Sequence, residues 1–204
     1  MLYASRTKRP PRTLTDAEVR RLLKVSGDHR AGFRDHLIIS LALGCGLRES
    51  EIVALDVGDV ARFEGSKMTV KRTIQLRVFK RGGGKADPKD QRVPVPDGTF
   101  YKLEKYVRGL GERSGPLFRS RKGGARLSDR AVRWMIRRWQ ARAGFDQPFA
   151  FHHLRHTSIS NVQRAARDLR VSQKFARHTN INTTTIYEHA SDEEVQRAAK
   201  GLAS

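Results

Sequence analysis

FHHLRHTSIS, at residues 151–160, constrains the interpretation of this chain more than any other segment. Three of the seven histidines fall within five residues there, around Arg155. His152 lies three positions before Arg155, so a helix would place both side chains on one face, and this spacing favours His152 over His153. A guanidinium can hold two phosphate oxygens, and an imidazole beside it can move a proton. The segment therefore predicts phosphate chemistry, with His153 and His156 as possible structural neighbours.

A second segment, ARHTNINTTTIYEH at residues 176–189, carries a histidine and a tyrosine. Tyr187 follows His178 by nine positions. A phenol has a pKa near ~10 and is a poor nucleophile unless a nearby cation or base favours its ionised form. The histidines and Arg155 could supply that help, so Tyr187 is a candidate nucleophile.

A third segment, LGCGLRESE at residues 43–51, places Arg48 directly after an apolar stretch and a glycine turn. Glycine permits the tight turn that ends a helix. A long apolar helix leading to one charged residue indicates an arginine held in a defined position.

The charge of the chain indicates its partners. Its 41 Lys and Arg residues against 21 Asp and Glu residues give a formal net charge of +20, which favours a polyanion and nucleic acid first. Residues 119–142 hold nine basic residues and a single acid, Asp129. On the helix expected there, Val132, Met135, Ile136 and Trp139 form an apolar stripe. Arg130, Arg133 and Arg137 lie on another face and are candidate DNA-binding residues.

Other classes of protein are disfavoured by what the sequence contains. Cys45 is the only cysteine, which excludes an intramolecular disulfide and a cysteine-based zinc site. Acidic and histidine residues show no metal-ligand spacing, so no metal is expected. Gly82-Gly83-Gly84-Lys85 lacks the Ser/Thr of a phosphate-binding loop. The apolar run at 37–47 is too short to span a bilayer, and the basic N-terminus is no secretory signal, so we expect a cytoplasmic protein with no membrane partner.

Local patterns predict an α+β fold that is mainly helical. A capping box at Thr15–Glu18 opens a helix to about residue 24, and an apolar helix spans about 32–43, broken by Gly44 and Gly46. A short helix starts near Arg48. Further helices are expected at about 99–108, after Ser128, and at about 152–166, 169–177, 180–189 and 193–202. Strands at 68–70, 73–78 and 92–95 predict a small three-stranded antiparallel sheet.

The three segments together resemble the signature boxes of the tyrosine recombinase/phage integrase family, over about residues 13–200. The resemblance implies an integrase-type catalytic domain that cleaves and rejoins DNA through a covalent 3′-phosphotyrosine. Arg48 and Arg155 then match the two arginines that clamp the scissile phosphate. His152 matches the histidine that assists proton transfer, His178 matches a phosphate-binding position, and Tyr187 matches the nucleophile. Glu51 matches a scaffold residue, and no cofactor is implied.

The family also uses a hairpin lysine to protonate the departing 5′-oxygen. Lys80 is the first choice, Lys85 the second and Lys89 the third, because the intervening glycines prevent an assignment by spacing. Lys85 is otherwise a candidate DNA contact. Two positions depart from the family pattern: Ala176-Arg177 precede His178 where Leu-Gly is common, and Cys45 stands where threonine is common.

The resemblance also implies an organisation and partners. Residues 1–13 are expected to be a flexible basic arm and residues 14–204 a catalytic domain without the N-terminal core-binding domain of most members. Double-stranded DNA and a homotetramer on DNA are the implied partners, with a nucleoid-associated location if the source is prokaryotic. Two other readings stay open: a type IB topoisomerase-like enzyme, and a DNA-binding regulator that is inactive alone.

Overall fold

The computed structural model describes residues 11–29, 32–76, 91–121 and 123–177. These residues divide into a larger unit, residues 12–158, and a smaller unit whose described part is Pro11 with residues 159–177. The described helices are α1 (Asp16–Asp28), α2 (Phe33–Cys45), α3 (Glu49–Ala54), α4 (Val57–Val60), α5 (Asp97–Leu110), α6 (Asp129–Arg142), α7 (His152–Ala166) and α8 (Leu169–Ala176). The described strands are β1 (Ala61–Glu64), β2 (Lys67–Val70), β3 (Thr73–Gln75) and β4 (Arg92–Pro94).

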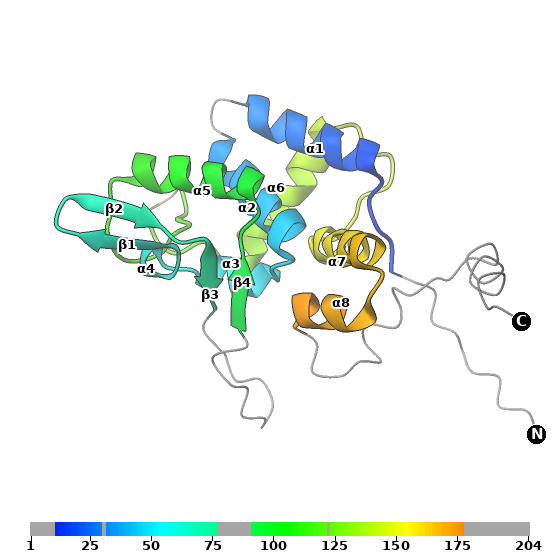
Figure 1. The fold of residues 1–204 in the computed structure, drawn as a ribbon. Helices are drawn as coiled ribbons and strands as arrows, with labels where there is room; N and C mark the ends of the chain where they lie inside the picture. Colours follow the sequence, from blue (N-terminus) through cyan, green and yellow to red (C-terminus); the bar gives the residue numbers. More distant parts are fainter. Residues whose placement is uncertain (1–10, 30–31, 77–90, 122, 178–204) are drawn as a thin grey trace, which may run out of the picture. The chain divides into compact units, whose positions relative to one another are not determined.

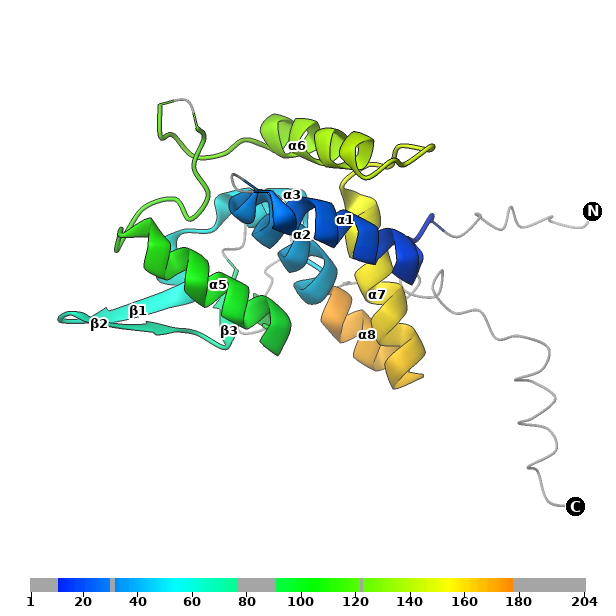
Figure 2. The same ribbon diagram turned by 90° about the horizontal axis from the view of Figure 1, so that it is seen from above.

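Helix α2 forms the centre of the larger unit (Figure 1). Every residue from Leu37 to Ala42 is buried, and α2 packs against α1, α3 and α5. Figure 2 shows α2 between α1 and α5. Such a helix has no polar face to present to water, which agrees with its nearly continuous apolar sequence. The end of α2 therefore has a fixed position in the core.

The C-terminus of α2 differs from the expected break at Gly44. Gly44 lies inside the helix, and Gly46 ends it with a left-handed φ of 59°. A Cβ on Gly44 would come within 2.6 Å of the Thr99 hydroxyl on α5. Gly44 therefore permits close packing of two helices, whereas Gly46 provides the left-handed turn.

The helix starts agree with the capping signals in the sequence. The backbone N–H of Glu18 donates to the Thr15 hydroxyl at 3.2 Å, and the Glu18 carboxylate accepts from the backbone N–H of Thr15 at 2.8 Å. Ser128 likewise caps α6 through the backbone N–H of Ala131. The predicted apolar stripe of α6 is buried, with Trp139 fully so. Both expected helix starts are confirmed.

The mainly helical α+β class is confirmed, but the strands pair differently from the single three-stranded sheet that was expected. In the described residues, β1 pairs with β2 and β3 pairs with β4, both antiparallel. The backbone N–H of Lys71 donates to the carbonyl of Val60, which directly precedes β1. The carbonyl of the next residue, Arg72, accepts from the backbone N–H of Val95, which directly follows β4. The chain therefore changes hairpins between residues 71 and 72, and β1 is a strand that the sequence patterns did not indicate.

The smaller unit contains the C-terminal part of α7 together with α8. Asp168 caps α8 by accepting from the backbone N–H groups of Arg170 and Val171. Ile159, Phe175 and Ala176 form a small apolar cluster within this unit. Residues 169–176 therefore form a helix close to the predicted range.

Candidate phosphate-binding site

Arg48 lies at the junction between the central helix and α3. It is the N-cap residue of α3, two positions after the left-handed Gly46. Glu51 accepts hydrogen bonds from the backbone N–H and the Nη1 of Arg48, both at 2.7 Å. The side chain of Arg48 remains 44% exposed. Glu51 therefore orients a guanidinium that solvent can still reach.

Arg155 approaches the same junction from α7. Although its side chain carries a charge, the residue is only 7% exposed. Its Nη1 donates a hydrogen bond to the carbonyl oxygen of Gly46, 109 positions away in the sequence. The structure thus brings Arg155 to the turn that ends in Arg48, and a buried cation at that turn creates a local positive charge in a medium of reduced polarity.

His152 begins α7 and lies within a cluster of three imidazoles. Its ring stacks on His153 with centroids 4.2 Å apart and meets His156 edge-on at 5.4 Å. Burial, followed by the charge of His153, lowers the pKa of His152. A neutral imidazole one helical turn before Arg155 can accept a proton. His153 is tied instead to the backbone through its Nδ1 and the carbonyl of Ala150, at 3.0 Å.

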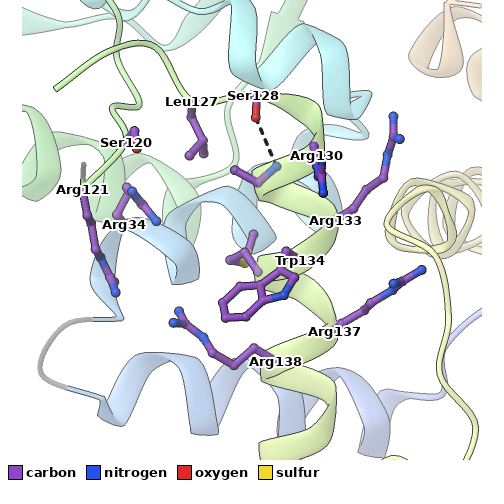
Figure 3. Close-up of a pocket in the computed structure, with 12 residues that line it drawn as sticks. Arg34, Ser120, Arg121, Leu127, Ser128, Arg130, Arg133, Trp134, Arg137 and Arg138 are labelled. Carbon is purple, nitrogen blue, oxygen red and sulfur yellow. Dashed lines mark hydrogen bonds between the residues drawn. The ribbon is translucent and has the colours of Figure 1, made fainter. Parts of the chain in front are cut away.

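The three candidate DNA-binding arginines of α6 are all exposed, as the sequence predicted. The Arg133 Nε donates to Glu49 at 2.8 Å, and Glu49 directly follows Arg48. Burial raises the pKa of Glu49, whereas the charge of Arg133 opposes that shift. Figure 3 shows Arg130, Arg133 and Arg137 projecting from the same helix. This ion pair ties the basic face of α6 to the turn that carries Arg48.

Other candidates fall in parts of the chain that the structure does not describe. Lys80, Lys85 and Lys89, together with His178 and Tyr187, lie outside the described residues. The described site therefore consists of Arg48, Arg155 and His152.

Sequence reasoning missed two residues beside the basic face, Asp35 and Trp134. Asp35 is fully buried although it is charged, whereas Trp134 is 65% exposed although it is aromatic. Helical spacing could have indicated Trp134, because it lies four positions after Arg130 and three before Arg137 and therefore shares their exposed face of α6. The burial of Asp35 depends on α6, about a hundred positions away, and no local pattern signals it.

No described helix has both the length and the apolar character needed to cross a bilayer. Within the described ranges, no three histidine, cysteine, aspartate or glutamate side chains are grouped closely enough to bind a metal ion.

Known proteins resemble this chain over almost its whole length. The sequence profile of the phage integrase family matches residues 12–194. Tyrosine recombinase XerC of Vibrio parahaemolyticus is 33% identical over 200 residues, which cover 96% of this chain and 60% of the relative. Tyrosine recombinase XerD of Ralstonia nicotianae is 34% identical over 95% of this chain and 60% of its own length. The chain thus spans about 60% of the length of these relatives.

Solved structures show the same fold. The crystal structure of XerA recombinase matches 95% of this chain and 66% of its own with a TM-score of 0.71 at 24% identity. The catalytic domain of bacteriophage HP1 integrase matches 93% of this chain and 94% of its own with a TM-score of 0.61 at 21% identity. The fold places Arg155 at the Arg48 turn, and the family profile covers both arginines. This chain belongs to the phage integrase family.

Proposed function

We propose that the chain is a site-specific DNA recombinase that cuts and rejoins strands through a covalent 3′-phosphotyrosine. The observation that carries this proposal is the hydrogen bond from the buried Arg155 to Gly46, in the turn that ends in Arg48. Two guanidiniums at one turn, with His152 one helical turn away, suit a phosphodiester whose charge increases during reaction. The similarity to tyrosine recombinases supports this function.

In the proposed reaction, the oxygen of Tyr187 attacks phosphorus and forms a phosphotyrosine bond, while His152 takes up the phenolic proton. The bond between phosphorus and the 5′-oxygen breaks, and Lys80 or Lys85 donates the proton that this oxygen takes up. Arg48, Arg155 and His178 hold the non-bridging oxygens. Removing one such electrostatic donor typically costs ~2.7–4 kcal/mol of transition-state stabilisation.

His152 assists proton transfer in this proposal, and its lowered pKa supports that role because the imidazole is neutral near pH 7. Rejoining reverses the same steps with a 5′-hydroxyl as the nucleophile. The phosphotyrosine retains the energy of the original phosphodiester, so strand exchange consumes no nucleotide.

Binding to duplex DNA is assigned to Arg130, Arg133 and Arg137 on α6, with Lys85 as a further contact. Their exposure and the net charge of +20 support electrostatic binding. We further propose that residues 14–204 form the catalytic domain, that residues 1–13 form a basic arm, and that a homotetramer assembles on DNA. A cytoplasmic, nucleoid-associated location in a prokaryotic cell would agree with a DNA substrate.

The test is covalent capture of DNA. The full chain is incubated with nicked duplexes of randomised sequence, in which loss of a short fragment prevents rejoining. We expect a denaturation-resistant adduct, whose recovered DNA identifies the cleavage sequence. Tyr187→Phe should abolish the adduct, whereas Tyr101→Phe, which alters an exposed tyrosine on α5, should leave it unchanged. An adduct of undiminished yield with Tyr187→Phe would overturn the assignment of the nucleophile.

A further inference from the structure

A hollow of about 650 Å³ lies beside α6, and its lining includes Arg130, Arg133 and Arg137. Its walls come from α6, the start of α2 and the segment around residues 120–128. Figure 3 shows the indole of Trp134 in this hollow, with Arg138 beside it and Arg34 and Arg121 on the opposite wall. The lining contains no acidic residue. The hollow therefore combines an aromatic surface with several cations.

The buried carboxylate of Asp35 lies beneath these cations. It accepts from Nε and Nη2 of Arg34 at 2.9 and 2.7 Å, and from Nη2 of Arg138 at 2.9 Å. The indole N–H of Trp139 donates to the same carboxylate at 3.1 Å, and Nη2 of Arg121 lies 3.9 Å away. One negative charge thus serves three guanidiniums, so the group keeps a net positive charge while its geometry is fixed.

The three arginines differ in their access to solvent. Arg34 also donates to the carbonyl of Arg119 at 2.6 Å, and its side chain is only 17% exposed. The side chains of Arg138 and Arg121 are 31% and 49% exposed. Arg34 and Asp35 are therefore suited to positioning, whereas Arg121 and Arg138 can reach a ligand.

Trp134 supplies the apolar part of the hollow. Its side chain is 65% exposed, and the Arg138 guanidinium lies 5.6 Å from the ring centroid. Positions 130–138 extend over about 12 Å of helix axis, and the same length of duplex carries about seven phosphate charges. An anionic ligand with apolar surface between its charges would match both the aromatic ring and the arginines.

We propose that this hollow binds duplex DNA, with Trp134 packed against deoxyribose and base edges and with Arg121 and Arg138 on the flanking phosphates. Asp35 is a positioning residue for these arginines. The inference rests on the proposed function because it requires a DNA substrate, yet it concerns residues other than those assigned to the reacting phosphate. Arg130, Arg133 and Arg137 also line the hollow, and the inference adds to their electrostatic binding an apolar contact that salt does not screen.

The test measures the binding of a labelled duplex of mixed sequence to the full chain over a series of salt concentrations. We expect Trp134→Ala to weaken binding about tenfold, because the apolar surface of the indole is no longer buried against the duplex, without changing the slope of log affinity against log salt. Arg138→Ala should reduce that slope by about 0.9, because one phosphate contact is lost. Tyr101→Ala, which removes another exposed aromatic on α5, is the matched control.

Fluorescence provides a second readout, because the chain has two tryptophans and Trp139 is buried. Duplex DNA should change the emission of the unaltered chain but not that of Trp134→Phe. Equal affinities and emission changes in the Trp134 variants and the unaltered chain would overturn the inference. If Trp134→Ala weakened the binding of a glutamate-rich peptide but left the DNA affinity unchanged, the inference would be overturned in favour of a protein partner. If the chain bound duplex DNA through Trp134 but formed no covalent adduct, only the proposed cleavage reaction would be contradicted, and this inference would stand.

Discussion

At the scale of single residues, burial separates two kinds of charged group in this molecule. Arg48 is exposed and held by Glu51, whereas Asp35 is entirely enclosed and satisfied by partners from distant segments. An exposed ion pair contributes little to stability, but a buried carboxylate becomes costly to replace once its cationic partners remain without it. The effect of a substitution on the free energy of unfolding should therefore differ strongly between buried and exposed acidic residues.

Asp35→Ala is expected to lower the free energy of unfolding by about 3–5 kcal/mol, because Arg34 and Arg138 would lose their buried counter-charge. Asp28→Ala, at an exposed position on α1, should change it by less than about 0.5 kcal/mol. Urea denaturation followed by circular dichroism measures both values. Equal values for the two variants would show that Asp35 is not a structural centre.

His36 provides a residue-level test of pH dependence. It is 8% exposed, and its Nδ1 lies 2.9 Å from the Ser26 hydroxyl. Burial, followed by the charge of Lys102, lowers the pKa of His36 from 6.5 to about 4. An unfolded histidine binds its proton near pH ~6.5, so acid favours the unfolded chain. The contribution of His36 is thus complete above about pH 6.5 and is lost as the pH falls toward 4.

Between pH 7 and pH 4.5, this effect should remove about 2.5 kcal/mol of stability. His36→Gln should lose correspondingly less over the same interval, because glutamine does not titrate. Unfolding free energies of both chains at the two pH values measure the difference. An identical acid-induced loss in the variant would show that His36 does not contribute to the pH dependence.

At the scale of elements, local capping signals were the most reliable guide. Thr15 and Ser128 start helices where the sequence indicated, because a cap involves residues only three positions apart. The break expected at Gly44 was wrong, because its close contact with Thr99 joins two helices that are distant in sequence. Likewise, β1 was missed although Ala61-Arg62-Phe63-Glu64 alternates between apolar and polar residues, because four residues are too few to establish a strand without its partner β2.

Thr15→Ala should lower the free energy of unfolding by about 1 kcal/mol, because the backbone N–H of Glu18 loses its side-chain partner. Thr13→Ala changes an exposed threonine outside α1 and is the matched control. Thermal unfolding of the two variants under the same conditions gives the comparison. A loss with Thr13→Ala as large as that with Thr15→Ala would contradict the role of the capping box.

At the scale of the whole molecule, sequence motifs named the candidate residues of the described site but not its surroundings. Arg48, Arg155 and His152 were all candidates, and the structure brings Arg155 to the Arg48 turn. The contact between them spans 109 positions, so spacing alone could not place it. The hollow beside α6 was missed for the same reason, since Asp35 and Arg138 meet only when α2 and α6 pack together.

The net charge of +20 leads to a prediction about DNA affinity at this scale. Replacing both Arg130 and Arg137 by alanine should reduce the slope of log affinity against log salt by about 1.8, at roughly 0.9 for each lost phosphate contact. Replacing Arg20 and Arg62, two exposed arginines outside α6, removes the same charge. The second pair should change the slope by clearly less. Equal slopes for both pairs would show that total charge, rather than the α6 face, governs binding.

The most direct test of the proposed phosphate clamp compares adduct formation on two substrates. One carries the ordinary phosphodiester at the cleavage position, and the other carries an uncharged methylphosphonate there. On the phosphodiester, Arg48→Ala and Arg155→Ala should each slow adduct formation by roughly 100- to 1,000-fold, whereas Arg62→Ala should not. On the methylphosphonate, both losses should be much smaller, because less negative charge remains to be stabilised. Undiminished losses on the uncharged substrate would contradict a clamp that acts by neutralising the phosphate.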